Sequence, residues 1–133
     1  MKKYGKELGK SPESLRKNDA VHAAGLASLE ICRGAGVSIG YGSDLNMRSQ
    51  QQQADGLTLH RRVMSAHEVI QSATLINAEI VRQEGKLGEL VPGAFADLLV
   101  VAGNPYESLD CLQGDGNQMT AIMKDGRFYK NVL

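Results

Sequence analysis

Asp44 is the residue of this chain whose position most favours chemistry. It follows Gly42 and Ser43 at the end of a short apolar run, so its carboxylate would lie at the carboxyl end of a strand. In α/β barrels that end of each strand carries the catalytic groups. Aspartate also caps turns and helices, and on the local sequence alone this structural role is the one favoured.

The histidines and cysteines do not complete a site around this aspartate. His22, His60 and His67 are the three histidines, and no pair has the HxH or HExxH spacing that holds zinc. We expect His22, in the first helix, to lie in the core or at its rim, and His60 and His67 to lie on the surface. The separate cysteines, Cys32 and Cys111, favour neither a zinc knuckle nor a disulfide framework and fit a reducing compartment.

A long helix and a strand come before Asp44. Residues 11–13 (SPE) supply an N-cap, a proline at the first helical position and an acidic first turn. An apolar periodicity continues from there to Gly34 and Gly36, which end the helix. The alternating run 37–41 then predicts a strand that leads into the aspartate.

Further helices follow, and the chain then becomes extended. Residues 57–64 predict a helical stretch, and SAHE at 65–68 is a capping box that begins a helix ending at Gly85. Residues 96–101 predict an apolar strand buried on both faces. Residues 124–126 (KDG) predict a hairpin turn between two more strands.

The overall composition excludes several classes of function. Lys+Arg and Asp+Glu both number 15 among 133 residues, so the formal net charge is zero. Nucleic acids and anionic membranes require a clustered positive field, which this balance does not favour. No run is long enough to span a bilayer, and the N-terminus has no apolar signal-peptide region. We therefore expect a cytoplasmic protein that binds neither nucleic acid nor membrane.

Five segments, in the same order, resemble the amidohydrolase superfamily. Residues 36–45 (GVSIGYGSDL) are similar to its last barrel strand, A-G-V-x-I-A-x-G-T-D, and residues 65–78 to the helix that follows. Residues 86–101 resemble its G-x-(I/L)-x-P-G-x-x-A-D-(L/I) segment. The closing N-P and (V/M)-K-D-G-(K/R) elements are matched by residues 104–105 (NP) and 123–127 (MKDGR).

Other segments narrow the resemblance to one branch. Residues 4–7 (YGKE), 11–14 (SPES) and 22–26 (HAAGL) are similar to imidazolonepropionase-like and Xaa-Pro dipeptidase-like members. The resemblance implies an α/β fold in which residues 1–84 are the C-terminal part of a (β/α)8 barrel, its last helix–strand–helix. Residues 85–133 would be the final strands of a small β-sandwich domain. A whole barrel needs about 250 residues, so we expect the chain to be a C-terminal fragment.

The resemblance also implies a metal-dependent hydrolase of C–N amide bonds, in which Asp44 binds the metal and transfers protons. A divalent metal, with zinc expected, lowers the pKa of a bound water. The neighbouring carboxylate accepts a proton as the water attacks the amide, and returns it to the departing nitrogen. The substrate would be a dipeptide or an N-acyl amino acid, and the parent enzyme would hold one or two metal ions.

The family's other metal ligands have no counterpart in this chain. Its first-strand HxH, its bridging lysine carboxylate and its two later histidines are missing, so we expect weak or no zinc binding and no activity from the chain alone. Two alternatives stay open: a deaminase or cyclic-amide hydrolase of the same superfamily, and a non-catalytic binding or assembly module. We expect the unpaired strand edges to be buried against the missing N-terminal portion or another copy of the chain, which would make an oligomer.

Overall fold

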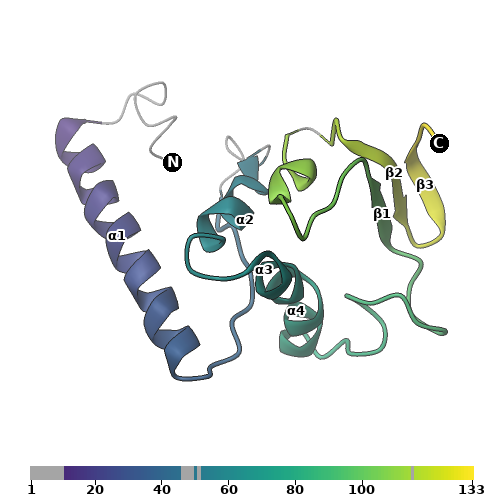
Figure 1. Cartoon of the computed structure of the whole chain (residues 1–133), viewed down its shortest axis with the longest axis horizontal. Coiled ribbons are helices and arrows are strands. Elements are labelled where there is room, and N and C mark those ends of the chain that lie inside the picture. The colour runs from purple at the N-terminus through teal and green to yellow at the C-terminus, as the bar shows by residue number, and fades with distance from the viewer. Residues whose placement is uncertain (1–10, 46–49, 51, 115) are drawn as a thin grey trace. The chain divides into compact units, whose positions relative to one another are not determined.

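The computed structural model describes residues 11–45, 50, 52–114 and 116–133, which form a mixed α/β chain. Contacts divide the chain into two compact units, residues 1–37 and 38–133. The YGKE motif at residues 4–7 lies outside the described residues. None of the described helices is long and apolar enough to cross a membrane. Figure 1 shows the elements: α1 (Pro12–Gly34), α2 (Asp55–His60), α3 (Ala66–Ala73), α4 (Leu75–Ile80), β1 (Leu98–Val101), the 3-10 helix η2 (Leu109–Leu112), β2 (Met119–Lys124) and β3 (Arg127–Asn131).

The helix α1 begins and ends where the sequence predicts. Pro12 occupies the first helical position, where its missing N–H costs nothing. Beyond the last turn, Gly36 takes a φ of +70°, the left-handed conformation that ends many helices. Val21 and Ile31 of α1 are 70% and 71% exposed, so the helix buries little apolar surface.

The second helical region begins with the predicted capping box. Ser65 Oγ accepts a hydrogen bond from the Glu68 N–H (3.2 Å), and Glu68 Oε2 accepts one from the Ser65 N–H (2.7 Å). The α3 helix that follows buries Val69 and Ser72 completely. Before it, α2 covers only the first part of the helical stretch predicted at 57–64. The core cluster consists of Leu57, Met64, Ala66, Val69 and Leu109.

The single helix predicted to run to Gly85 is wrong, because α3 and α4 are separated at Thr74. Thr74 has a φ of −121° and a ψ of −88°, outside the helical range, and its Oγ1 donates to the Ile70 carbonyl oxygen (2.7 Å). The backbone of Gly88 packs on the break: a Cβ at that position would lie 2.6 Å from the Thr74 carbonyl carbon. Helical periodicity alone did not reveal this interruption.

The strand predicted at residues 37–41 is also wrong within the described part of the chain. This segment has no regular secondary structure, and no described strand pairs with it. A strand forms only where a neighbouring strand completes its hydrogen-bond ladder. The carbonyl oxygen of Ile39 and both polar backbone groups of Tyr41 are bonded instead to residues of α3 and α4.

Three strands form one antiparallel sheet in the order β1-β2-β3 (Figure 1). The predicted hairpin turn is confirmed: Asp125 and Gly126 have φ values of +49° and +75°, as a type I′ turn requires. The strand predicted at 96–101 is the shorter β1, and it is not buried on both faces. Leu99 and Val100 are 50% and 37% exposed, and β1 lies at an edge of the sheet.

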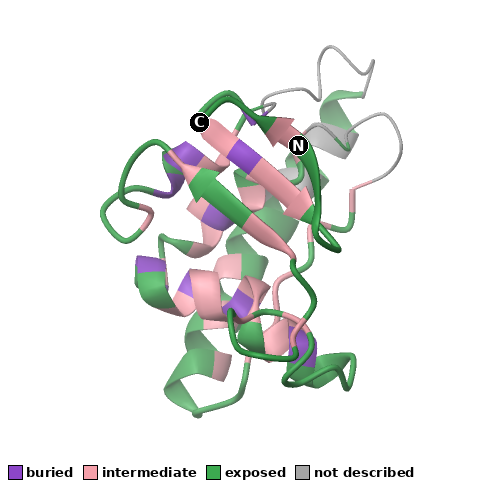
Figure 2. Ribbon diagram, turned by 90° about the vertical axis from the view of Figure 1, so that its right-hand side faces the viewer, coloured by how far each residue is buried: buried purple, intermediate pink, exposed green. Residues whose placement is uncertain are grey.

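Buried residues are few and lie mainly in the helices and in β2. Figure 2 shows that much of the chain is exposed, including most of the outer strand β3. On β2, Ala121 is completely buried. The core is therefore modest beside the apolar surface that the chain leaves exposed.

Candidate functional site

Asp44 lies at the end of a short segment, residues 39–44, which we call the Asp44 segment. The side chain of Asp44 is exposed, and the Asp44 backbone has a φ of +46°. Aspartate tolerates this left-handed conformation better than most residues do. Non-glycine residues held in it occur often at functional sites. Asp44 is therefore presented to solvent from an unusual backbone conformation, and its role as metal ligand and proton carrier stays a prediction.

Four hydrogen bonds, which we call the Ser72–Asn77 clamp, fix the first part of this segment to the helices. Ser72 Oγ donates to the Ile39 carbonyl oxygen (2.6 Å). The Tyr41 N–H is shared between the Ser72 carbonyl oxygen (3.2 Å) and Asn77 Oδ1 (3.1 Å). Asn77 Nδ2 donates to the Tyr41 carbonyl oxygen (2.8 Å). One residue from each of α3 and α4 thus replaces part of a strand ladder.

A glycine lets the helix approach this closely. A Cβ on Gly40 would lie 2.4 Å from Ile80 Cδ1 and 2.6 Å from Asn77 Oδ1. Any larger residue would displace the asparagine from the backbone that it binds. At Gly42, by contrast, an added Cβ would meet nothing within 4 Å. The close packing is therefore confined to the clamped part of the segment.

Tyr41 connects the Asp44 segment to the region around α2. Its hydroxyl donates to the Gln53 carbonyl oxygen, and its ring meets the His60 ring edge-on with centroids 5.2 Å apart. Burial, together with the negative charge of Asp55, raises the pKa of Tyr41. Burial lowers the pKa of His60, whose buried Nδ1 has no hydrogen-bond partner among the described residues. Both groups are uncharged near neutral pH, and His60 is half-buried, not on the surface as predicted.

The described residues do not by themselves form a metal site. No group of three or more His, Cys, Asp or Glu side chains within the described ranges could hold a metal ion. His22 is exposed on α1, contrary to the prediction that it lies in the core or at its rim, and His67 is exposed at the start of α3. A catalytic zinc needs about three protein ligands. Asp44 can supply one carboxylate, which does not fit the ion's full requirement.

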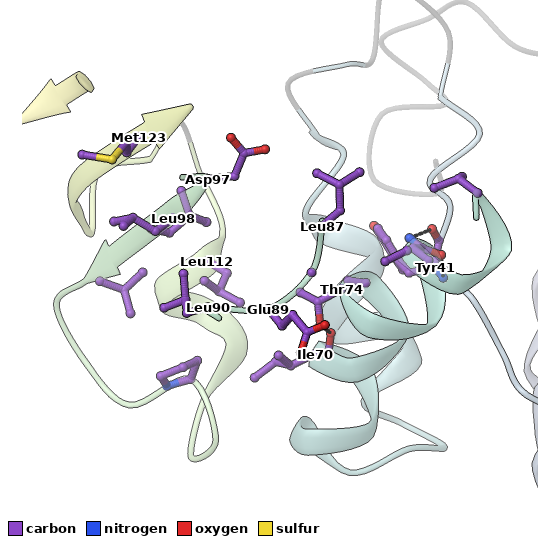
Figure 3. Close-up of a pocket in the computed structure, with 18 of the residues that line it drawn as sticks. Tyr41, Ile70, Thr74, Leu87, Glu89, Leu90, Asp97, Leu98, Leu112 and Met123 are labelled. Atoms are coloured by element: carbon purple, nitrogen blue, oxygen red, sulfur yellow. Dashed lines mark hydrogen bonds between the residues drawn. The ribbon is translucent and has the colours of Figure 1, made fainter. Parts of the chain in front are cut away.

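A cavity of about 920 Å³ has Tyr41 in its wall but not Asp44. Figure 3 shows Tyr41 and Thr74 on its helical side, and Leu98 and Met123 on the side of the sheet. Most of the lining is aliphatic. The polar members Thr74, Asn77 and Asp97 are bonded to other parts of the chain. We therefore interpret this cavity as an apolar packing face between helices and sheet.

Ser72 and Asn77 are the residues that sequence reasoning missed as parts of the site. Both lie within residues 65–78, where the sequence resembles a family helix, but periodicity treats them only as helix residues. Their signal is polarity among apolar neighbours, because buried polar side chains require hydrogen-bond partners. That signal indicates that a partner exists without identifying it.

The model of the amidohydrolase family matches residues 1–128. No curated protein matches the chain. Among solved structures, an amidohydrolase is 47% identical with a TM-score of 0.87, and the match covers 97% of this chain and 31% of that one.

Two further solved structures are similar. A prolidase complexed with N-methylphosphonate-L-proline is 37% identical with a TM-score of 0.86, and the match covers 97% of this chain and 32% of that one. A Xaa-Pro dipeptidase with bound methionine in the active site is 30% identical with a TM-score of 0.71, and the match covers 80% of this chain and 25% of that one. The chain spans about a third or less of the length of these structures.

Proposed function

Because the chain belongs to the amidohydrolase family, we propose that it is part of a metal-dependent hydrolase of C–N amide bonds in which Asp44 is a metal ligand and proton carrier. The observation that carries this proposal is the Ser72–Asn77 clamp. It fixes the segment that ends in an exposed carboxylate with a φ of +46°. The chain matches its relatives over about a third of their length, so the activity proposed is that of a larger protein.

We place residues 1–84 in the C-terminal part of a (β/α)8 barrel and residues 85–133 in a small β domain. The match to the similar amidohydrolase covers 97% of this chain but only 31% of the amidohydrolase. A barrel of this kind needs about 250 residues. The other strands of both parts would then come from polypeptide beyond the matched third.

The substrate class that we propose is a dipeptide, with an N-acyl amino acid as the closest chemical variant. Support comes from two of the similar structures, which are a prolidase and a Xaa-Pro dipeptidase. Both names concern an amide bond next to proline, so Xaa-Pro dipeptides are the first substrates to test. A cyclic amide is the comparison substrate, because hydrolysis of that class is the alternative within the superfamily.

The role that we assign to the Asp44 carboxylate is proton transfer. A divalent metal, when bound, supplies a water of lowered pKa, and its remaining ligands would come from outside the described residues. The Asp44 carboxylate would accept the proton of the attacking water and return it to the departing nitrogen. A carboxylate that binds the metal through one oxygen would keep the other oxygen free to accept the proton and then return it.

The test is Asp44→Asn in a protein that contains this chain and a complete metal site. The amide keeps the shape of the side chain but cannot take up the proton, so we expect kcat on a Xaa-Pro dipeptide to fall by about 10² to 10⁴ fold. Asp110→Asn, which neutralises another exposed aspartate, is the matched control. Near-normal turnover in Asp44→Asn would assign Asp44 to the capping of a turn.

A further inference from the structure

Asn77 satisfies both polar backbone groups of a single residue. Its Oδ1 accepts from the Tyr41 N–H at 3.1 Å, and its Nδ2 donates to the Tyr41 carbonyl oxygen at 2.8 Å. Only a side chain with both a donor and an acceptor can do this, and a carboxamide has the required pair. Asn77 therefore acts on this segment as one residue of a neighbouring strand would.

The break at Thr74 allows Ser72 and Asn77 to reach the same stretch of backbone. On a continuous helix, residues five apart point in directions that differ by about 140°. Here Ser72 binds the Ile39 carbonyl oxygen and Asn77 binds Tyr41, two residues away. The non-helical φ of −121° and ψ of −88° at Thr74 separate the two helices that carry them.

We propose that Ser72 and Asn77 are positioning residues for Asp44, and this inference rests on the proposed function of that carboxylate. Tyr41 is the last clamped residue before Asp44, and three residues of chain span about 10 Å at most. Gly42 between them has no steric neighbour for a Cβ within 4 Å. Holding Tyr41 in place therefore limits the region that the Asp44 carboxylate can reach.

The first measurement is amide hydrogen exchange at Tyr41 in the 133-residue chain, which needs no activity. Asn77→Leu keeps the size of the side chain and removes two bonds from the clamp, so we expect the Tyr41 amide to exchange at least about tenfold faster, the equivalent of about 1.4 kcal/mol. Ser72→Ala is a milder variant, because it removes only one hydroxyl. It takes the place of Asn77→Leu if that variant does not fold. Thr120→Val is the matched control, because it removes a side-chain bond to the Val100 carbonyl oxygen in the sheet.

The second measurement is steady-state kinetics of the same variants in a protein with a complete site. A displacement of about 1 Å at a catalytic group can cost about 10² in rate. We expect kcat to fall by that order in Asn77→Leu and by less in Ser72→Ala, with KM changed far less than kcat. Thr120→Val should leave both constants close to those of the unaltered protein.

The outcomes separate this inference from the proposed function. Unchanged Tyr41 exchange in both Asn77→Leu and Ser72→Ala would overturn the inference, whatever the activity. Faster exchange with a loss of kcat no larger than that of Thr120→Val would also overturn it, since the clamp would then be only structural. Asp44→Asn tests the proposed function independently, because a normal kcat there removes the role of Asp44 and leaves the exchange result intact.

Discussion

Asp97 joins the beginning of β1 to the turn between β2 and β3. Its carboxylate accepts a hydrogen bond from Lys124 Nζ and another from the Asp125 N–H (2.7 Å). The bond from Lys124 and the bond from Asp125 hold the pKa of Asp97 below its ordinary value. The charged form is therefore favoured in the folded chain, and it holds Asp125 where φ is positive.

Asp97→Asn should lower the melting temperature in a pH-dependent way. A carboxyl whose pKa is lower in the folded state stabilises the fold above its unfolded pKa, about 3.9. That contribution is lost as the pH falls through the folded pKa. We expect the gap in melting temperature between parent and variant to be full at pH 7 and to close below about pH 4. Thermal unfolding followed by circular dichroism measures it, with Asp110→Asn as the control, and a gap that is the same at every pH would contradict the charge-based explanation.

At the scale of single residues, the sequence indicates the candidate acid but not its surroundings. Asp44 stands out because it follows a Gly-Ser pair at the end of an apolar run. Its partners in the fold cannot be found in the same way, because the clamp joins residues 33 and 36 positions apart. Sequence patterns report neighbours within a few residues, whereas these contacts depend on how the helices return to the segment.

At the scale of elements, a glycine from another part of the chain packs against the break between α3 and α4. Gly88 has a φ of +82°, and a Cβ there would lie 2.6 Å from the carbonyl carbon and oxygen of Thr74. Gly85 has a similar φ of +70° but open space around it. A comparison of alanine substitutions at Gly85 and Gly88 therefore separates the cost of a left-handed backbone from the cost of a steric clash.

Gly88→Ala should destabilise the chain more than Gly85→Ala does. The left-handed conformation costs an alanine about 1–2 kcal/mol at either position, and only the substitution at Gly88 adds a backbone clash. Chemical denaturation of the two variants gives their free energies of unfolding. Equal losses would show that the approach of residue 88 to the break contributes nothing to stability.

Elements whose signals are local could be predicted from the sequence, and those that need a partner could not. The capping box at Ser65 and the Asp125-Gly126 turn form through neighbouring residues, and both are confirmed. The segment at 37–41 has the composition of a strand, but pairing requires a second strand in the right place. The edge position of β1 likewise follows from the topology of the sheet and not from its apolar sequence.

At the scale of the whole molecule, the exposed apolar surface predicts association with another polypeptide. Leu99 and Val100 on the edge strand β1 are 50% and 37% exposed, and the cavity of about 920 Å³ is mostly aliphatic. Unpaired edges recruit further strands, and large apolar faces are rarely left open in a monomer. We propose that another polypeptide covers them, either a second copy of the chain or the remainder of a larger amidohydrolase.

Light scattering on the 133-residue chain at micromolar concentration should show a mass above that of a monomer. Leu99→Lys places a charge on β1 and should reduce the association, as charges on natural edge strands do. Val21→Lys on α1, where the valine is 70% exposed, controls for the added charge. A compact monomer that unfolds cooperatively would favour an autonomous module.

Family membership was predictable at this scale, because five ordered segments carry it and the family match extends over residues 1–128. The division into a barrel part and a β domain remains a prediction, since it concerns polypeptide beyond the third that this chain matches. The substrate class stays a proposal, because the matches use about a third or less of each similar structure.

The Ser72–Asn77 clamp also sets an order of events during synthesis of the chain. Asp44 leaves the ribosome well before Asn77, whose amide closes the clamp on a residue 36 positions earlier. At about 5–20 residues per second, that interval is on the order of a few seconds. Until Asn77 has been added, two of the four hydrogen bonds of the clamp cannot form. If Ser72 and Asn77 position Asp44 as proposed, the candidate catalytic group is thus translated early and positioned late.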